Sequence, residues 1–200
     1  MSKFEDYTYN KARDGILAID DKTAADIYAL SFYYWFVEDD LRKPILSVGY
    51  NTYTRWRAYT PAPGQQTQWP IASDSDEAGW NYAFWLQHEG EACTIGEART
   101  EASARKEWIQ SLGCWYTDEE QEEDFDRTIE LGGKIQEQFV GLCIAVARHL
   151  HDEGIILKKF GRPIPILVHE LEYYDGIAEA TRRANPRGLA KEFENWIANM

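Results

Sequence analysis

The chain has 200 residues, with 34 Asp and Glu against 21 Lys and Arg, so its formal net charge is −13. The content of 44% hydrophobic and 14% aromatic residues excludes wholesale disorder, and a chain of this length is expected to fold as one domain, residues 1–200. Because so acidic a chain repels nucleic-acid backbones and anionic lipids, we expect neither nucleic acid nor a membrane as its partner.

The first half of the chain predicts a helix followed by a hairpin. Residues 2–20 show the spacing of an amphipathic helix. Residues 26–37 carry aromatic and β-branched side chains on both alternating faces, which is typical of a central strand covered on both sides. Residues 45–50 are expected to return as its antiparallel partner. The Pro-, Gly- and Asp-rich residues 60–79 predict a long loop, and the apolar residues 80–86 predict a short strand.

The second half predicts several helices and one strand. Residues 97–112 have helical spacing, and residues 124–153 form the clearest helix, with Phe125 and Ile129 on its apolar row. The apolar alternation in 163–173 predicts a strand, and two helices are expected at 176–184 and 187–199. Together these elements predict a single α+β domain whose antiparallel sheet is packed by N-terminal, central and C-terminal helices.

The cysteines and the N-terminus indicate a reduced, cytoplasmic protein. Cys93, Cys114 and Cys143 are odd in number and widely spaced, which argues against a disulfide framework and a structural zinc site. The first residues are polar and lack the apolar core of a signal peptide. The longest apolar-rich run is about eleven residues, too short for a membrane span.

No established catalytic motif is present in the sequence. There is no GxSxG elbow, P-loop or GxGxxG fingerprint. The weak alternative is a metal site at His169, Glu170 and Glu172. Two carboxylates on one strand face can ligate a divalent cation. Charged pairs on a solvated strand face are the commoner interpretation. We therefore expect no catalytic residue, no cofactor and no metal site.

The stronger signal is for protein binding. Seven of the nine residues 118–126 are acidic, and several tryptophans surround the predicted loop. Aromatic anchors beside acidic side chains suit recognition of a basic protein partner, although acidic runs are commonly solvated faces and tryptophans commonly lie in the core. The predicted partner-binding residues are Trp69, Asp74, Asp76, Glu77, Trp80, Trp85, Asp118, Glu119, Glu120, Glu122, Glu123 and Asp124.

Three stretches carry a family resemblance. They are DIYALSFY at 26–33, VGYNT at 48–52 and GRPIPILVHELEYY at 161–174, the last followed by ANP at 184–186. In these the chain resembles a family of uncharacterised bacterial cytosolic domains of about this length. That family has no settled activity, and related small acidic domains serve as immunity proteins beside polymorphic toxins. Because no catalytic residues are established for that family, none can be carried over to this chain.

Three functional hypotheses follow. The first is a non-enzymatic cytoplasmic immunity protein, whose acidic, aromatic-rich surface neutralises a cognate toxin domain. The second is a small metal-assisted hydrolase that uses His169, Glu170 and Glu172. The third is a regulatory or ligand-binding domain with a small-molecule pocket among Trp80, Trp85 and Tyr173.

Overall fold

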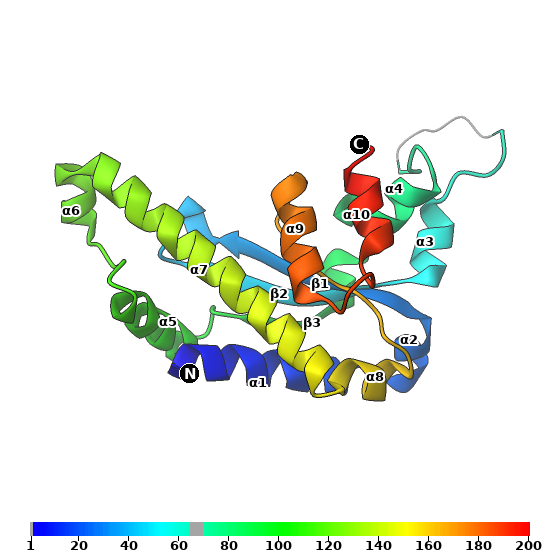
Figure 1. The fold of residues 1–200 in the computed structure, drawn as a ribbon, viewed down its shortest axis with the longest axis horizontal. Helices are drawn as coiled ribbons and strands as arrows, with labels where there is room; N and C mark the ends of the chain where they lie inside the picture. The colour runs from blue at the N-terminus through cyan, green and yellow to red at the C-terminus, as the bar shows by residue number, and fades with distance from the viewer. Residues whose placement is uncertain (1, 65–69) are drawn as a thin grey trace.

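The computed structural model describes residues 2–64 and 70–200 and has an α+β fold built on a mixed sheet (Figure 1). In the described residues the sheet has the order β3-β2-β1-β4. Its strands are β1 (Ile27–Phe36), β2 (Pro44–Thr52), β3 (Glu91–Ile95) and β4 (Ile166–His169). β2 pairs antiparallel with both β1 and β3, which confirms the predicted hairpin.

The fourth strand corrects the expectation of a wholly antiparallel sheet. β4 pairs with β1 in parallel, with Leu30 opposite Ile166 and Tyr33 opposite His169. A parallel pair requires a crossover connection, and the helices between β2 and β4 supply it. The predicted strand 163–173 is also too long, since Pro163 and Pro165 have no N–H group to donate to a ladder.

The predicted helices are all present, with bounds shifted by a few residues. The described helices are α1 (Lys3–Ala18), α2 (Asp21–Asp26), α3 (Tyr53–Tyr59), α4 (Ser75–Trp80), α5 (Arg99–Ser111), α6 (Asp118–Glu123), α7 (Phe125–Asp152), α8 (Ile155–Phe160), α9 (Asp175–Ala184) and α10 (Lys191–Ile197). None of the helices in these described ranges combines the length and the apolar character that crossing a membrane requires.

The segment from 60 to 95 departs most from the prediction. The expected loop 60–79 ends early, because Asp74 caps α4, and residues 65–69 lie outside the described residues. The expected strand 80–86 contains instead the 3-10 turn Tyr82–Phe84. β3 was not predicted, since five residues between Gly90 and Gly96 are too few to show a clear alternation.

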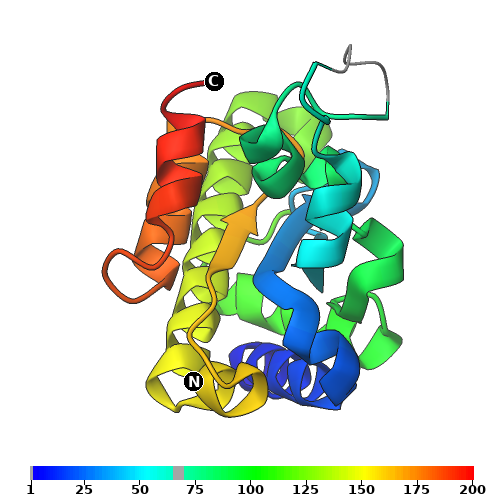
Figure 2. The same cartoon turned by 90° about the vertical axis from the view of Figure 1, so that its right-hand side faces the viewer.

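The long helix α7 crosses one face of the sheet. It runs diagonally from α6 at one end of the molecule to α8 near the other (Figure 1), while α9 and α10 lie side by side (Figure 2). On its way α7 packs with α1 and α5, where the Phe4 ring centroid lies 5.4 Å from that of Trp108 and 6.4 Å from that of Phe139. These contacts place aromatic side chains of the core between α1, α5 and α7.

The outer edge of β4 is covered by the side chains of Thr181 in α9 and of Asn185, the residue that caps the C-terminus of α9. Asn185 accepts from the Ile166 N–H at 2.8 Å and donates to the Ile166 carbonyl at 2.7 Å. Thr181 accepts from the Val168 N–H at 3.1 Å. Because an open edge is a template for unwanted strand pairing, these side chains take the place of a neighbouring strand.

Candidate functional site

The acidic run 118–126 forms a short helix and the first turn of the next. The Thr117 hydroxyl accepts from the Glu120 N–H and the Glu120 carboxylate accepts from the Thr117 N–H, which is a capping box that starts α6. Asp124 ends α6 and caps α7 by accepting from the Arg127 N–H at 3.1 Å. No residue of α6 is buried, so its acids project into solvent.

Two apolar side chains lie exposed beside these acids. Phe125 is 60% exposed and Ile129 is 55% exposed, and their i, i+4 spacing puts them together on α7. We refer to them as the apolar pair. The sequence predicted both on the buried row of this helix, and that expectation is wrong. The N-terminal turns of α7 lie with α6 at one end of the molecule (Figure 1), and these two side chains are exposed there.

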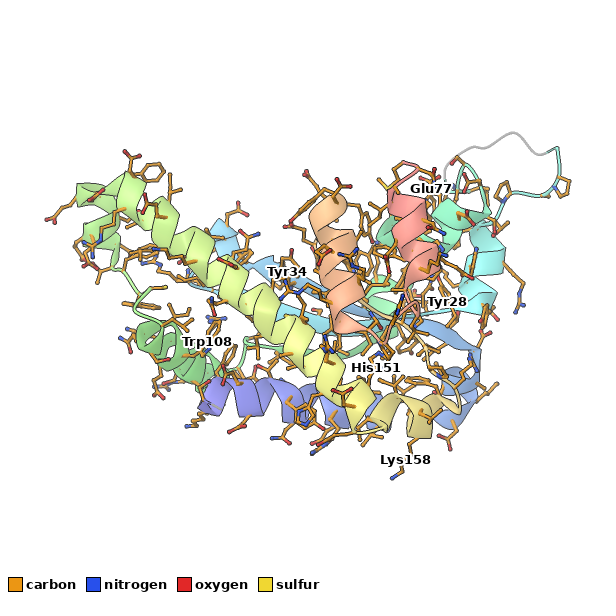
Figure 3. All side chains as sticks on the ribbon, in the orientation of Figure 1. Tyr28, Tyr34, Glu77, Trp108, His151 and Lys158 are labelled. Carbon is orange, nitrogen blue, oxygen red and sulfur yellow. The ribbon has the colours of Figure 1, made fainter. Side chains whose placement is uncertain are left out.

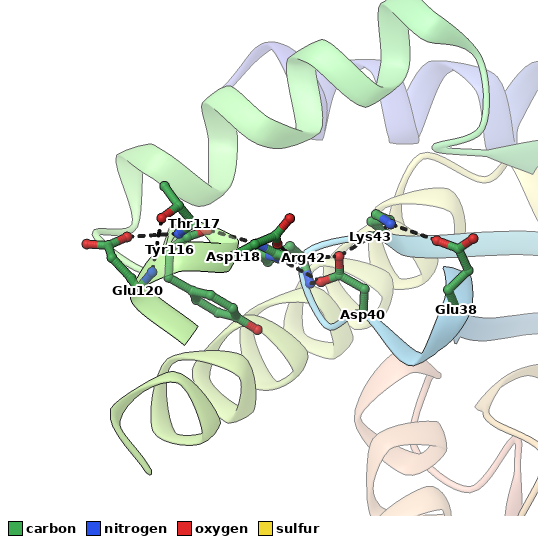
Figure 4. A network of polar contacts seen from close by, with 8 residues as sticks. All are labelled: Glu38, Asp40, Arg42, Lys43, Tyr116, Thr117, Asp118 and Glu120. Atoms are coloured by element: carbon green, nitrogen blue, oxygen red, sulfur yellow. Dashed lines mark hydrogen bonds and ion pairs between the residues drawn. The ribbon is translucent and has the colours of Figure 1, made fainter. Parts of the chain in front are cut away.

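The tip of the β1–β2 hairpin is tied to α6 by Arg42 (Figure 4). The guanidinium forms ion pairs with Asp40 at 2.8 Å and Asp118 at 2.7 Å, and it donates to the Tyr116 carbonyl at 3.1 Å. Its carbon also lies 4.8 Å from the centroid of the Tyr116 ring. Hydrogen bonding to Asp40 raises the pKa of Arg42 further above its ordinary value, so this side chain stays charged and holds the two segments in register.

A hollow of about 430 Å³ lies between the hairpin tip and α7. It is lined by Leu41 and the apolar pair, by carboxylates of the hairpin tip and α6, and by the cations Arg42 and Lys43, which are ion-paired with carboxylates. Glu38 and Asp39 at the tip have left-handed φ angles of 56° and 57° and are exposed. We call the surface formed by residues 38–42 and 116–129 the acidic end. Its chemistry is that of an apolar contact surrounded by negative charge.

The second predicted acidic group lies elsewhere. Asp74 accepts from the Glu77 N–H at 2.8 Å and Glu77 accepts from the Ser73 N–H at 2.7 Å, so both stabilise the start of α4. Asp76 is exposed. α4 and the labelled Glu77 are at the opposite end of the long axis from α6 (Figures 1 and 3). The two groups therefore do not form one surface, and Trp69 lies outside the described residues.

The predicted aromatic anchors belong largely to the interior. Trp80 is 4% exposed and Trp85 is 1% exposed, and the Trp85 indole donates to the Gly79 carbonyl at 2.9 Å. The Tyr173 hydroxyl accepts from the Tyr82 N–H, and its ring packs on Phe193. The expectation that Trp80 and Trp85 present an exposed binding surface is therefore wrong, since both indoles are used for internal packing.

The His169 strand carries a buried hydrogen-bonded pair. His169 is fully buried, with Nε2 2.7 Å from the Ser31 hydroxyl and Nδ1 3.0 Å from the Glu170 carbonyl. A carbonyl only accepts, so Nδ1 carries the proton and Nε2 accepts from Ser31. Burial lowers the pKa of His169 to about 4, which keeps the ring neutral.

The carboxylates of this strand do not join His169. Glu170 accepts from the Tyr34 and Tyr174 hydroxyls, and Glu172 is exposed. Across residues 2–64 and 70–200, no group of three or more His, Cys, Asp or Glu side chains is arranged to hold a metal ion. The weak metal alternative at His169, Glu170 and Glu172 therefore has no geometric support.

Comparison with known proteins adds no assignment. No protein-family model matches the chain, no curated protein matches it and no solved structure matches it. The description of the candidate site therefore depends on its geometry alone. The acidic residues of this site were predicted from the sequence, but the exposed apolar pair and Leu41 were not. Phe125, an apolar residue inside an otherwise acidic run, is the feature of the sequence that could have indicated an exposed apolar contact.

Proposed function

We propose that this protein binds a basic protein partner through its acidic end and, more specifically, that it is an immunity protein that neutralises a toxin domain. The observation that supports this proposal most is the exposure of the apolar pair. Exposed apolar side chains near carboxylates suit a partner surface with an apolar contact flanked by Lys and Arg. The acids steer the encounter, and the apolar contact slows dissociation.

The immunity role rests on the electrostatic match and on the resemblance described above. A toxin domain that acts on nucleic acid or nucleotides needs a basic cleft, and an acidic plug would both associate rapidly and cover that cleft. The Arg42 ion pairs support this role, because they hold the hairpin tip and α6 together as one preformed surface. Binding then costs less conformational entropy.

The direct experiment measures binding and inhibition with the product of the adjacent gene. We expect the wild-type protein to bind that product and abolish its activity. The double variant Phe125→Ala/Ile129→Ala should weaken binding by about tenfold or more, because buried aromatic anchors dominate interfaces. The variant Glu122→Gln/Glu123→Gln should mainly slow association and reduce its dependence on salt.

Leu157→Ala is the matched control, since Leu157 is 57% exposed on α8, away from the acidic end. It should bind as the wild type does. An adjacent gene product that neither binds nor is inhibited would contradict the immunity role. Equal losses for Leu157→Ala and the apolar-pair variant would contradict the assignment of the surface.

A further inference from the structure

A second hollow, of about 420 Å³, lies at the other end of the molecule from the acidic end. Aromatic side chains from β1, α3 and α4 line one side of this hollow. Residues from the segments 162–165 and 188–195 line the other side. Its volume falls within the range of small-molecule sites in proteins, which are concave and lined by aromatic groups with a few polar groups. The aromatic residues are Tyr28, Tyr53, Trp56 and Trp80.

The aromatic wall presents ring faces. The Tyr53 and Trp56 rings are nearly parallel, at an angle of 10° with centroids 6.2 Å apart, and the Tyr28 ring lies 4.9 Å from that of Trp56. The Tyr28 hydroxyl donates to the Gly79 carbonyl and the Trp56 indole donates to the Ser75 carbonyl. Because Tyr53 is 40% exposed, its ring can stack on a planar ligand.

Two cations line the same hollow without carboxylate partners. Arg162 is held in place by donating through Nη2 to the Ile27 carbonyl at 2.6 Å, and its guanidinium carbon lies 5.9 Å from the centroid of the Tyr53 ring. Lys191 is exposed. In the described part of the chain, neither side chain forms an ion pair, whereas Arg42 and Lys159 do. A positioned guanidinium and an exposed ammonium that line one hollow can together bind an anion.

The remaining polar groups favour a ligand that also donates N–H groups. The Glu192 carboxylate and the Asn195 side-chain amide line the hollow, and both can accept hydrogen bonds. A nucleoside monophosphate combines a planar ring, N–H donors and an anionic group. We infer that this hollow binds a nucleoside monophosphate, whose base stacks on Tyr53 and whose phosphate meets Arg162 and Lys191. The inference uses none of the residues of the acidic end and is independent of the proposed function.

Calorimetric titration of the full chain with AMP and GMP tests the inference. We expect saturable binding of at least one of them in the millimolar range or below. Adenosine and ribose 5-phosphate separate the two halves of the ligand, and each should bind at least about tenfold more weakly than the better nucleotide. Absence of saturable binding by both nucleotides would overturn the inference, and ribose 5-phosphate binding as tightly as AMP would overturn the assignment of the aromatic wall.

Two variants locate the site. Lys191→Gln should weaken nucleotide binding by about tenfold, since it removes a charged donor, while Lys158→Gln on α8 should leave binding unchanged. Tyr53→Ala should also weaken binding by about tenfold or more through loss of stacking. Both substitutions replace exposed residues, and thermal melts check that the variants fold. Binding that is unchanged in Lys191→Gln and Tyr53→Ala would overturn the inference.

Discussion

At the scale of single residues, His169 shows how burial decides the role of a side chain. Its sequence context, next to Glu170 and near Glu172, is equally compatible with a metal ligand and with a solvated strand. In the structure His169 is neither a metal ligand nor solvated. Its ring is fully buried, and its two nitrogens are hydrogen-bonded to Ser31 and to the Glu170 carbonyl. The pair is a polar connection between β1 and β4 inside the core.

This burial makes stability depend on pH. The folded protein takes up a proton on His169 only near pH 4, whereas the unfolded chain takes it up near the ordinary pKa of 6.5. Between these values the unfolded state binds more protons, so the contribution of this residue to stability falls as the pH falls from 6.5 to 4, by up to about 3 kcal/mol. In His169→Gln that contribution is absent, so the free energy of unfolding should decrease less steeply over this window.

Urea unfolding of the wild type and the variant at pH 7 and pH 4.5 measures the difference. His88→Gln is the control, because His88 is exposed, and it should retain the wild-type slope. If the curves of wild type and His169→Gln stay parallel from pH 7 to pH 4.5, His169 does not carry this pH dependence.

At the scale of secondary-structure elements, the contact between α9 and β4 links a helix to a strand edge through side chains. Thr181 and Asn185 lie one turn apart and bond the main chain of Ile166 and Val168. Asn185 also contacts His151 of α7 at 3.0 Å, so the same residue fastens α7 to this edge. A strand of four residues can thus end the sheet without a further strand beside it.

We therefore expect Asn185→Ala to lower the free energy of unfolding by about 2–4 kcal/mol, since the main-chain N–H and carbonyl of Ile166 lose their partners while buried. Hydrogen exchange should accelerate at the Ile166 amide more than at the Leu30 amide, which donates to the Pro165 carbonyl. Asn195→Ala, an exposed Asn→Ala change on α10, should alter neither quantity. Unchanged protection at Ile166 would contradict this account of the edge.

At the scale of the whole molecule, negative charge is distributed along the long axis rather than gathered on one face. α6 and the hairpin tip hold acids at one end, and Asp74, Asp76 and Glu77 lie at the other (Figures 1 and 3). Within α6, Glu119 and Glu123 are like charges at i, i+4 spacing and repel each other. The acidic end is therefore kept at some loss of stability.

This repulsion predicts a salt effect. Adding monovalent salt should raise the melting temperature of the wild type, because salt screens exposed like charges. The double variant Glu122→Gln/Glu123→Gln should be more stable than the wild type at low salt and should respond less to salt. The control Glu137→Gln/Glu172→Gln removes the same charge from dispersed exposed positions. If both double variants gain equally, the local repulsion in α6 is not the cause.

The elements with long, locally repeated patterns could be predicted from the amino-acid sequence. The helical spacing of 124–153 and the doubly apolar strand 26–37 correspond to α7 and β1, because each pattern is repeated over many residues. The capping acids of α4, α6 and α7 also act locally, although their role as caps rather than as binding groups became visible only in the hydrogen bonds.

Which of these residues are exposed to a partner depends on how distant segments pack in the fold. Trp80 and Phe125 are both large apolar residues near acids in sequence, yet one is 4% and the other 60% exposed. Exposure depends on what the rest of the chain places on a side chain: α10 covers Trp80, whereas α7 extends Phe125 to the end of the molecule. The parallel pairing of β4 and the unpaired Arg162 beside Tyr53 likewise arise between segments far apart in sequence, which local patterns do not encode.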